Sequence, residues 1–169
     1  MPIEIEQLAD EHLAGFHAAV DTVARERKYL SRTEAAPLER MKSWVAASLA
    51  KGGVHLVALE GSAVVGWCDI NRHEAPSQAH RGILGMGMLP GYRGQGAGKA
   101  LLVRAVADGH ARGIHRIELD VHADNVPAIA LYRRCGFIEE GRRQAGARID
   151  GVYKDLVLMA HIDRAALGL

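Results

Sequence analysis

The sequence predicts an α/β fold: a mixed, mostly antiparallel central sheet of about seven strands with helices on both faces. Two observations lead to this prediction. Short segments in which apolar and polar residues alternate, typical of strands, are interleaved with segments whose apolar residues recur every three or four positions, typical of helices. In chain order, the expected elements are one strand, two helices, three strands, a helix, a strand, a helix and two strands.

The first fifty residues are expected to form one strand and two helices. Residues 3–8 alternate like a short strand, and from there to about Lys51 the apolar residues recur at helical spacing. Pro37 suits the first turn of the second helix, and the pair Gly52-Gly53 ends it.

The remainder of the chain is expected to alternate between strands and helices. Gly61 and Ser62 mark a hairpin turn, and Asn125 is placed to cap a helix. An exposed loop is expected between the last two strands. The strands are expected at 54–60, 63–71, 83–89, 116–122, 137–143 and 152–161. The helices are expected at 97–112 and 126–135.

The composition is that of one globular domain, which we expect to span residues 1–169. Hydrophobic residues make up 49% of the chain and charged residues 24%, and this is ordinary globular usage. The net charge of +1 creates no global field that favours nucleic acid or an anionic membrane. No stretch approaches the ~20 apolar residues of a membrane span, and the acidic N-terminus does not resemble a signal peptide. We therefore expect a cytoplasmic protein with neither a nucleic-acid nor a membrane partner.

The cysteines and histidines give no sign of a disulfide framework or a metal site. Cys68 and Cys135 are expected to pack as small apolar residues in a reducing compartment. The nine histidines are scattered, His110 and His115 lie five positions apart, and no His-Glu-x-x-His motif occurs. The sequence therefore predicts no metal.

Glycine is distributed unevenly, and its densest stretch joins a predicted strand to a predicted helix. Seven of the 19 glycines lie between Gly82 and Gly98. A glycine-rich turn of this kind exposes backbone N–H groups at a helix N-terminus, where the helix dipole also favours an anion. Arg93 and Lys99 can add counter-charge to such a site.

Two common nucleotide-binding loops do not fit this turn. A Walker A loop requires glycine where Arg93 stands and a hydroxyl residue where Ala100 stands. A dinucleotide-binding fingerprint that starts at Gly94 requires glycine at Lys99. A tight turn that binds nothing remains the alternative for the loop taken alone.

Two motifs resemble those of the GNAT family of N-acetyltransferases. The segment Arg93-Gly94-Gln95-Gly96-Ala97-Gly98 is similar to the family's Q/R-x-x-G-x-G/A motif. The segment from Asn125 to Tyr132, followed by Gly136-Phe137, resembles the family's N-x-x-A-x-x-x-Y…GF pattern. Together they cover about 55 residues, roughly 83–137. The resemblance implies a sheet splayed between the fourth and fifth strands, acetyl-CoA as cosubstrate, and acetyl transfer to an amine.

The resemblance also assigns the cosubstrate contacts. A backbone N–H at Met86, Gly87 or Met88 would face the acetyl oxygen on a splayed or bulged strand. The alternative is that Gly85 and Gly87 relieve crowding under a helix. The CoA pyrophosphate would be held by Arg93, Gly94, Gln95, Gly96, Ala97, Gly98 and Lys99.

The second motif supplies the expected general acid. Tyr132 occupies the family's acid position, and a phenol with a reference pKa near 10 can donate to a leaving thiolate. A buried aromatic with a hydrogen-bonded hydroxyl is the alternative. Asn125 can both cap its helix and bind the pantetheine arm. Arg133 and Arg134 would reach the adenosine 3′-phosphate or remain solvated.

The general base is less determined. Glu118, Asp120 and His122 lie on one side of a strand that should be apolar on both faces, which indicates a polar cleft. Asp120 stands where some protein-acetylating relatives carry a glutamate base. Because the side chain of aspartate is shorter than that of glutamate, Asp120 would take the proton through a water molecule. It can instead accept backbone N–H bonds from the turn around residues 124–125. Glu118 is the other candidate, or is exposed at an edge. Glu26 and Glu34 would bind a cationic acceptor or belong to a solvated face.

The acceptor is expected to be a small primary amine that attacks acetyl-CoA directly in a ternary complex. The near-neutral charge offers no extended acidic face for a polyamine or an aminoglycoside. The alternatives are acetylation of protein N-termini or lysines, and a catalytically silent acetyl-CoA sensor. The resemblance further implies a possible homodimer, which would pair through the alternating residues of 152–158.

Overall fold

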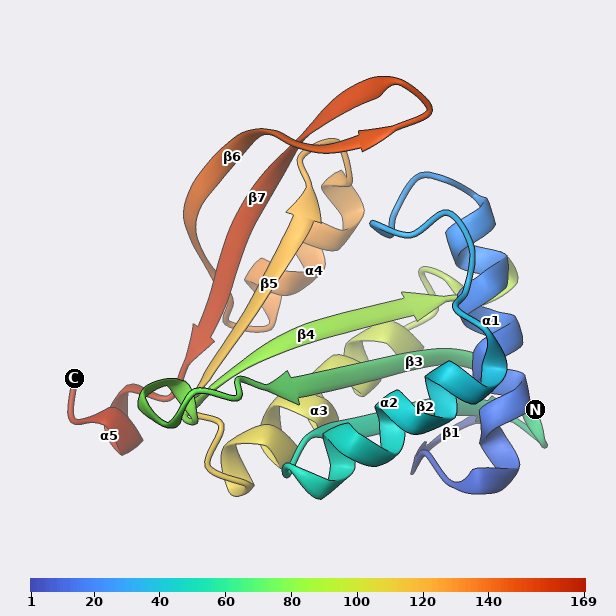
Figure 1. The fold of residues 1–169 in the computed structure, drawn as a ribbon, viewed down its shortest axis with the longest axis horizontal. Coiled ribbons are helices and arrows are strands. Elements are labelled where there is room, and N and C mark those ends of the chain that lie inside the picture. The colour runs from blue at the N-terminus through green and yellow to red at the C-terminus, as the bar shows by residue number, and fades with distance from the viewer.

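The computed structural model describes residues 1–169, and its core is one seven-stranded sheet with the order β1-β2-β3-β4-β5-β7-β6 (Figure 1). Neighbouring strands are antiparallel except β4 and β5, which run parallel. This confirms the predicted fold class. The strands are β1 (Ile3–Gln7), β2 (Val54–Glu60), β3 (Ala63–Arg72), β4 (Arg81–Met88), β5 (Arg116–His122), β6 (Ile138–Ile149) and β7 (Val152–Ile162).

Helices cover both faces of this sheet. In Figure 1, α1 and α2 lie in front of the sheet, and α3 and α4 lie behind it. No helix combines the length and the apolar character needed to cross a membrane. The helices are α1 (Leu13–Arg25), α2 (Leu38–Ala50), α3 (Ala97–Ala111), α4 (Val126–Arg134) and the short α5 (Arg164–Leu167).

The core is divided by the sheet into two clusters of buried side chains. Because strand side chains alternate between faces, β2 sends Leu56 to one cluster and Val57 to the other. The first cluster packs against Leu101 of α3, and the second packs against Phe16 of α1. Both faces of β2 are therefore buried from solvent, which explains its almost continuous apolar sequence.

The sheet opens between β4 and β5, as the sequence resemblance implied. The two strands pair only where residues 81–83 meet residues 116–118. Beyond Ile83 they diverge into the V that Figure 1 shows, β4 staying with β3 and β5 staying with β7. The splay leaves one edge of β4 without a strand partner along its second half.

The last two strands are longer than the sequence indicated. The segment expected as an exposed loop is mostly strand, because β6 continues to Ile149 and turns at Asp150-Gly151. Both turn residues have positive φ, 51° and 82°, as a two-residue hairpin turn requires. The Asp-Gly pair was the available signal. It was missed because β6 is an edge strand, exposed along most of its length, and shows no hydrophobic alternation.

Candidate active site

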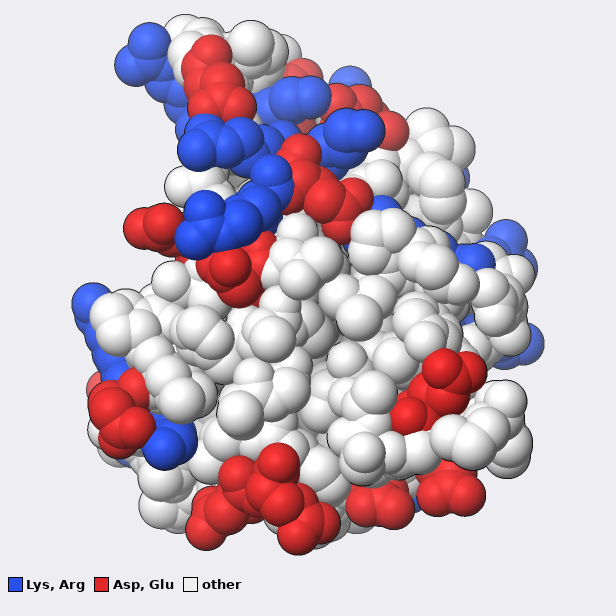
Figure 2. All heavy atoms as spheres, turned by 90° about the vertical axis from the view of Figure 1, so that its right-hand side faces the viewer, with Lys and Arg blue, Asp and Glu red and all other residues white.

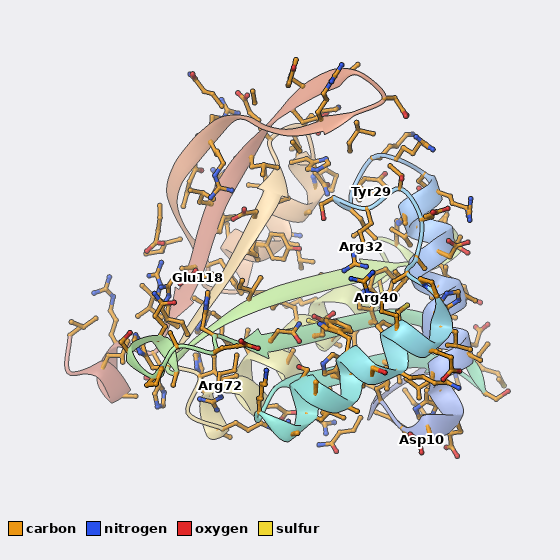
Figure 3. All side chains as sticks on the ribbon, viewed as in Figure 1. Asp10, Tyr29, Arg32, Arg40, Arg72 and Glu118 are labelled. Carbon is orange, nitrogen blue, oxygen red and sulfur yellow. The ribbon has the colours of Figure 1, made fainter.

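The splay between β4 and β5 opens a cleft of about 1080 Å³. Its walls come from β4, the glycine-rich turn, β5, α4, the β6–β7 hairpin and the connection between α1 and α2. Figure 3 shows Glu118 near the base of the V, where β4 and β5 meet, and Tyr29 of the α1–α2 connection at its open end. The cleft therefore brings together the two sequence motifs and a helical connection that neither motif includes.

Positive charge is concentrated on one side of this region. In Figure 2, most of the Lys and Arg side chains of the face shown gather in its upper part, with Asp and Glu among them, and other Asp and Glu side chains lie along its lower edge. The β6–β7 hairpin supplies Arg142, Arg143, Arg148 and Lys154. Most of these cations are paired: Arg143 lies 2.7 Å from Asp120, and Lys154 lies 2.5 Å from Asp124. Paired charges of both signs do not form an extended acidic surface.

The glycine-rich turn presents a row of free backbone donors. No N–H group from Gly94 to Lys99 donates a hydrogen bond within the protein. Gly94 and Gly96 have φ of +72° and +92°, so the turn needs residues without a Cβ at these positions. Gly96 is the N-cap of α3, and the positive end of the helix dipole therefore adds to the unpaired donors. The arrangement can hold a pyrophosphate.

The side chain of Arg93, expected to add charge to that anion site, is already paired within the protein. Its guanidinium pairs with both carboxylate oxygens of Glu26, at 2.5 and 3.0 Å, and donates to the Met88 carbonyl at 2.9 Å. It also lies over the ring of Tyr29. Because its donors face α1 and β4, Arg93 fastens the α1–α2 connection to the turn, and Lys99 is the cation left for the anion.

The free edge of β4 presents backbone groups to the cleft in a fixed order. His73 N–H donates to Arg81 and Leu89 N–H donates to Val65, at the two ends of one continuous β3–β4 register. In an antiparallel pair the bonded residues alternate, so odd-numbered residues of β4 bond to β3. Met86 and Met88 therefore turn their N–H groups toward the splay. The Gly87 N–H faces β3, which removes it as a donor to a cleft ligand.

No bulge occurs in β4, although the sequence left that possibility open. The β3–β4 register is regular. The register shift in this part of the sheet lies between β2 and β3, at Ala58/Leu59, where β3 carries the extra residue Val65. A Cβ on Gly87 would overlap the indole of Trp67. The glycine relieves crowding, as the alternative held, but against a side chain of the adjacent strand rather than under a helix.

Tyr132 lines the cleft from α4, is 8% exposed, and its hydroxyl makes no hydrogen bond within the protein. The hydrogen-bonded aromatic considered as an alternative is therefore not what the structure contains. Burial, with a smaller effect of the Cys68 thiol, raises the pKa of Tyr132 well above its ordinary value. The phenol keeps its proton at neutral pH and has no internal acceptor for it.

The other residues of the second motif have mixed outcomes. The Asn125 side chain accepts a hydrogen bond from the Ala128 N–H, which confirms its capping role, and it also lines the cleft. Arg134 lines the cleft. Arg133 instead pairs with Glu139 at 2.8 Å on the exposed surface.

Glu118 is neither exposed nor free. Its side chain is 20% exposed, and Arg81 and Arg116 donate three hydrogen bonds to its carboxylate at 2.6 to 3.0 Å. Burial raises the pKa of Glu118, but the hydrogen bonds from the two arginines outweigh it, and the pKa is lowered overall. A carboxylate held in this way is a weak proton acceptor, so Glu118 is better placed to fasten β4 to β5.

Asp120 lies farther along β5 and lines the cleft. Its carboxylate pairs with Arg143 rather than accepting N–H bonds from the turn around residues 124–125, so that alternative is wrong. The side chain is 45% exposed and has one ionic partner. Asp120 therefore remains able to contact water or a cleft ligand.

His122 is the residue that sequence reasoning passed over. It is 3% exposed yet contributes to the cleft wall, and its Nδ1 lies 2.9 Å from the Lys28 carbonyl oxygen. A carbonyl can only accept, so Nδ1 carries the proton and the Nε2 of the neutral ring keeps its lone pair. Its position on the polar side of β5, after Glu118 and Asp120, was the available signal.

The two glutamates of the helical region have different outcomes. Glu26 is occupied by Arg93, so it is not a solvated residue and has no free carboxylate oxygen for an acceptor. Glu34 is 70% exposed and lies 3.6 Å from Arg25, as a solvated face predicts.

Comparison with known families gives a match over most of the chain. The profile of the acetyltransferase (GNAT) family matches residues 11–137. Among curated proteins, the L-amino acid N-acetyltransferase of Escherichia coli K12 is 33% identical over 109 residues, which cover 63% of this chain and 67% of that protein. The mycothiol acetyltransferase of Paenarthrobacter aurescens is 35% identical over 72 residues, 43% of this chain but 22% of that protein.

The fold is also found among solved structures. A phosphinothricin acetyltransferase from Sinorhizobium meliloti, solved in complex with AcCoA, superposes with a TM-score of 0.89 at 20% identity. The superposition covers 96% of this chain and 89% of that one.

Proposed function

Because this chain belongs to the acetyltransferase (GNAT) family, we propose that it transfers the acetyl group of acetyl-CoA to the primary amine of a small, amino-acid-like molecule. The amine attacks directly in a ternary complex. The observation that carries this proposal is the meeting, in one cleft, of unpaired N–H groups at residues 94–99, the free edge of β4 and the unpartnered hydroxyl of Tyr132.

Binding of acetyl-CoA follows from the backbone. The donors from Gly94 to Lys99 take the pyrophosphate, and the Lys99 ammonium adds a positive charge. The pantetheine arm lies in the splay, where Met86 and Met88 offer N–H groups and Asn125 offers a side-chain amide. Arg134 is the remaining cleft-lining cation on α4 for the adenosine 3′-phosphate.

Acetyl transfer then needs charge stabilisation and a proton donor. The N–H of Met86 or Met88 faces the thioester oxygen, and one preorganised donor of this kind lowers the barrier by ~3 kcal/mol. The amine nitrogen bonds to the acetyl carbon as the carbon–sulfur bond breaks. The departing thiolate takes the phenolic proton of Tyr132, which the raised pKa of this residue retains until that step.

The amine must lose a proton before it attacks. His122 is the base that the geometry favours, because the Lys28 carbonyl fixes its tautomer and leaves Nε2 as an acceptor beside the cleft. Asp120 attracts the ammonium form of the acceptor and relays the proton through water. Glu118 is assigned a structural role, because Arg81 and Arg116 occupy its carboxylate.

The acceptor class rests on two observations. Charged groups in and beside the cleft form ion pairs, Arg93 with Glu26 and Arg143 with Asp120, rather than an acidic surface. A relative that matches 63% of this chain is named as an L-amino acid N-acetyltransferase. Acetylation of protein N-termini is the alternative, supported by the resemblance of Asp120 to a base position and by a match to an N-alpha-acetyltransferase.

The test is thiol release from acetyl-CoA with a panel of amino acids, other small amines and peptides. Tyr132→Phe keeps the ring and loses only the proton, so kcat should fall at least about tenfold while acetyl-CoA binding is unchanged. Tyr153→Phe, at an exposed position of β7, is the matched control and should behave as wild type.

Two results would count against the proposal. A Tyr132→Phe variant with wild-type kcat and a lower Tm would make Tyr132 a packing residue. If acetyl-CoA raises the Tm but no amine releases CoA, the chain is an acetyl-CoA sensor rather than an enzyme.

A further inference from the structure

A cluster of imidazoles and one carboxylate lies at the closed end of the sheet, outside the cleft. None of its members lines the cleft. Its members, called the histidine cluster below, are His110, His115, His161 and Asp163. We propose that the histidine cluster binds one divalent transition-metal ion, with zinc the best match to its donors.

The sheet topology brings these residues together. Arg116 and Ile162 are opposite each other at the ends of β5 and β7, so the residues just outside both strands are neighbours. The Asp163 N–H donates to the His115 carbonyl at 2.8 Å. His110 comes from the last turn of α3, which the tight turn at Gly113 returns toward β5.

His110 is oriented as metal-binding histidines usually are. Its Nδ1 lies 2.9 Å from the Ile114 carbonyl oxygen and therefore carries the proton. A ring held in this way keeps the lone pair of Nε2 directed outward, which is the common outer-shell arrangement of histidine ligands. This lone pair accepts a hydrogen bond from Nδ1 of His161, 3.0 Å away, and a bound metal ion would take the place of that proton.

His115 and Asp163 form the second pair of metal-donor groups, and the buried nitrogen of His115 has no hydrogen-bond partner. The Nδ1 atom of His115 is inaccessible to solvent and makes no hydrogen bond. It lies 3.5 Å from a carboxylate oxygen of Asp163. Buried polar atoms without a partner are uncommon in folded proteins, and a metal ion between these groups would supply the missing partner.

The distances fit a small site that contracts around its ion. The donor atoms of His110, His115 and Asp163 all lie within 4.8 Å of one another. Tetrahedral zinc with bonds of about 2.0–2.1 Å to nitrogen places neighbouring donors roughly 3.3 Å apart. The three side chains are half-buried, so small side-chain rotations can bring the donor atoms from their present separations to the spacing that zinc requires.

The donor types decide between metals. Imidazole nitrogen suits zinc, copper and nickel, whereas magnesium and calcium prefer oxygen ligands throughout. Bound zinc would join the end of α3, the start of β5 and the end of β7. Its effect is therefore on stability, and it leaves the chemistry in the cleft unchanged.

The experiment measures metal binding directly and does not depend on the acetyltransferase activity. Protein without a polyhistidine tag is dialysed against a chelator and titrated with zinc chloride by calorimetry, with Tm measured before and after. We expect one zinc per chain and a rise in Tm of about 5 °C. Cobalt substitution should give the visible absorption of a tetrahedral site.

Two variants report on the ligands. His115→Gln removes one nitrogen ligand. Asp163→Asn removes the charge but keeps the oxygen that accepts from the Ala166 N–H and caps α5, so the fold should be retained. Each should weaken zinc binding at least about tenfold. His17→Gln, on the distant α1, is the control and should bind as wild type.

The proposal is overturned if wild-type protein binds no zinc at micromolar concentration, which would leave a purely hydrogen-bonded cluster. It is also overturned if both ligand variants bind zinc as tightly as His17→Gln. Neither result would affect the proposed acetyl transfer, because thiol release is measured separately and in the presence of chelator.

Discussion

Replacing Asp69 by asparagine should make the protein more stable at alkaline pH and change how stability depends on pH. Asp69 lies in β3 opposite Gly85 and is 7% exposed. Burial raises its pKa from 3.8 to about 7, against the lowering effects of a 2.7 Å hydrogen bond from Asn71 and of the charge on Arg32 (Figure 3). At pH 8 the folded protein therefore holds a desolvated carboxylate that the unfolded chain leaves in water.

The sign and size follow from the folded and unfolded pKa values. The folded pKa is raised, so the neutral acid stabilises the fold fully below the unfolded pKa of 3.8, and this stability is lost as pH rises through about 7. The folded and unfolded pKa values differ by about three pH units, and each unit corresponds to about 1.4 kcal/mol. The free energy of unfolding therefore falls by about 4 kcal/mol in all, of which about 3 kcal/mol is lost between pH 5 and 8. The amide introduced by Asp69→Asn would carry no charge at any pH and could still accept the hydrogen bond from Asn71.

Urea unfolding of wild type and Asp69→Asn at pH 5, 6, 7 and 8 gives the free energy of unfolding of each. We expect the advantage of the variant to grow by about 3 kcal/mol across this range. His55, whose pKa burial lowers to about 4, acts in the opposite direction but equally in both proteins, so it cancels in the difference. Parallel profiles, with a difference constant within about 0.5 kcal/mol, would refute the reasoning that Asp69 is desolvated.

The remaining predictions concern the cleft and the assembly. Acetyl-CoA at 100 times its Kd should raise the Tm by about 8 °C, and Gly96→Val, which forces a β-branched residue to φ +92°, should abolish most of this rise. Arg93→Ala should cost about 2 kcal/mol of stability through the lost pairing with Glu26 yet leave acetyl-CoA affinity within about threefold, contrary to a role in pyrophosphate binding. His122→Gln should lower kcat/KM about 100-fold at neutral pH, and a wild-type kcat/KM would exclude this base. The expected homodimer predicts a dimer mass by light scattering at micromolar concentration, which a purely monomeric profile would contradict; β7, which carries residues 152–158, lies between β5 and β6, so these residues could contribute only side chains and not a free strand edge.

Local signals in the sequence correctly predicted several features of the backbone. The turn before α3, the cap at Asn125 and the apolar pattern of β2 are each set by interactions within a few residues: helix ends, turn geometry and alternation. The position of Tyr132 in the cleft follows from the same local order, since a helix that starts at a fixed cap presents its residues at fixed angles. The edge strand β6 was underestimated because an exposed strand carries no apolar pattern.

The partners of the charged side chains were not encoded locally. Arg93 sits beside the glycine turn in sequence, but Glu26, 67 positions away, takes its guanidinium. Glu118 lies two positions from Arg116, yet Arg81, 37 positions away, also pairs with it. Such pairings depend on which strands and loops the core brings within a few ångströms.

By itself, then, the sequence determined the order of the elements, the splayed sheet through its family motifs, and the glycine-rich turn that we propose as the pyrophosphate site. The tertiary structure alone decided which ionisable groups are free to act, by closing Glu26 and Glu118 into ion pairs and fixing the tautomer of His122. It also brought His110 of α3 and His161 of β7 together, although they are 51 positions apart in the chain. The physical reason is the distance along the chain over which each kind of interaction acts. Backbone conformation responds to neighbours along the chain, whereas the protonation and pairing of a side chain respond to neighbours in space, which only packing supplies.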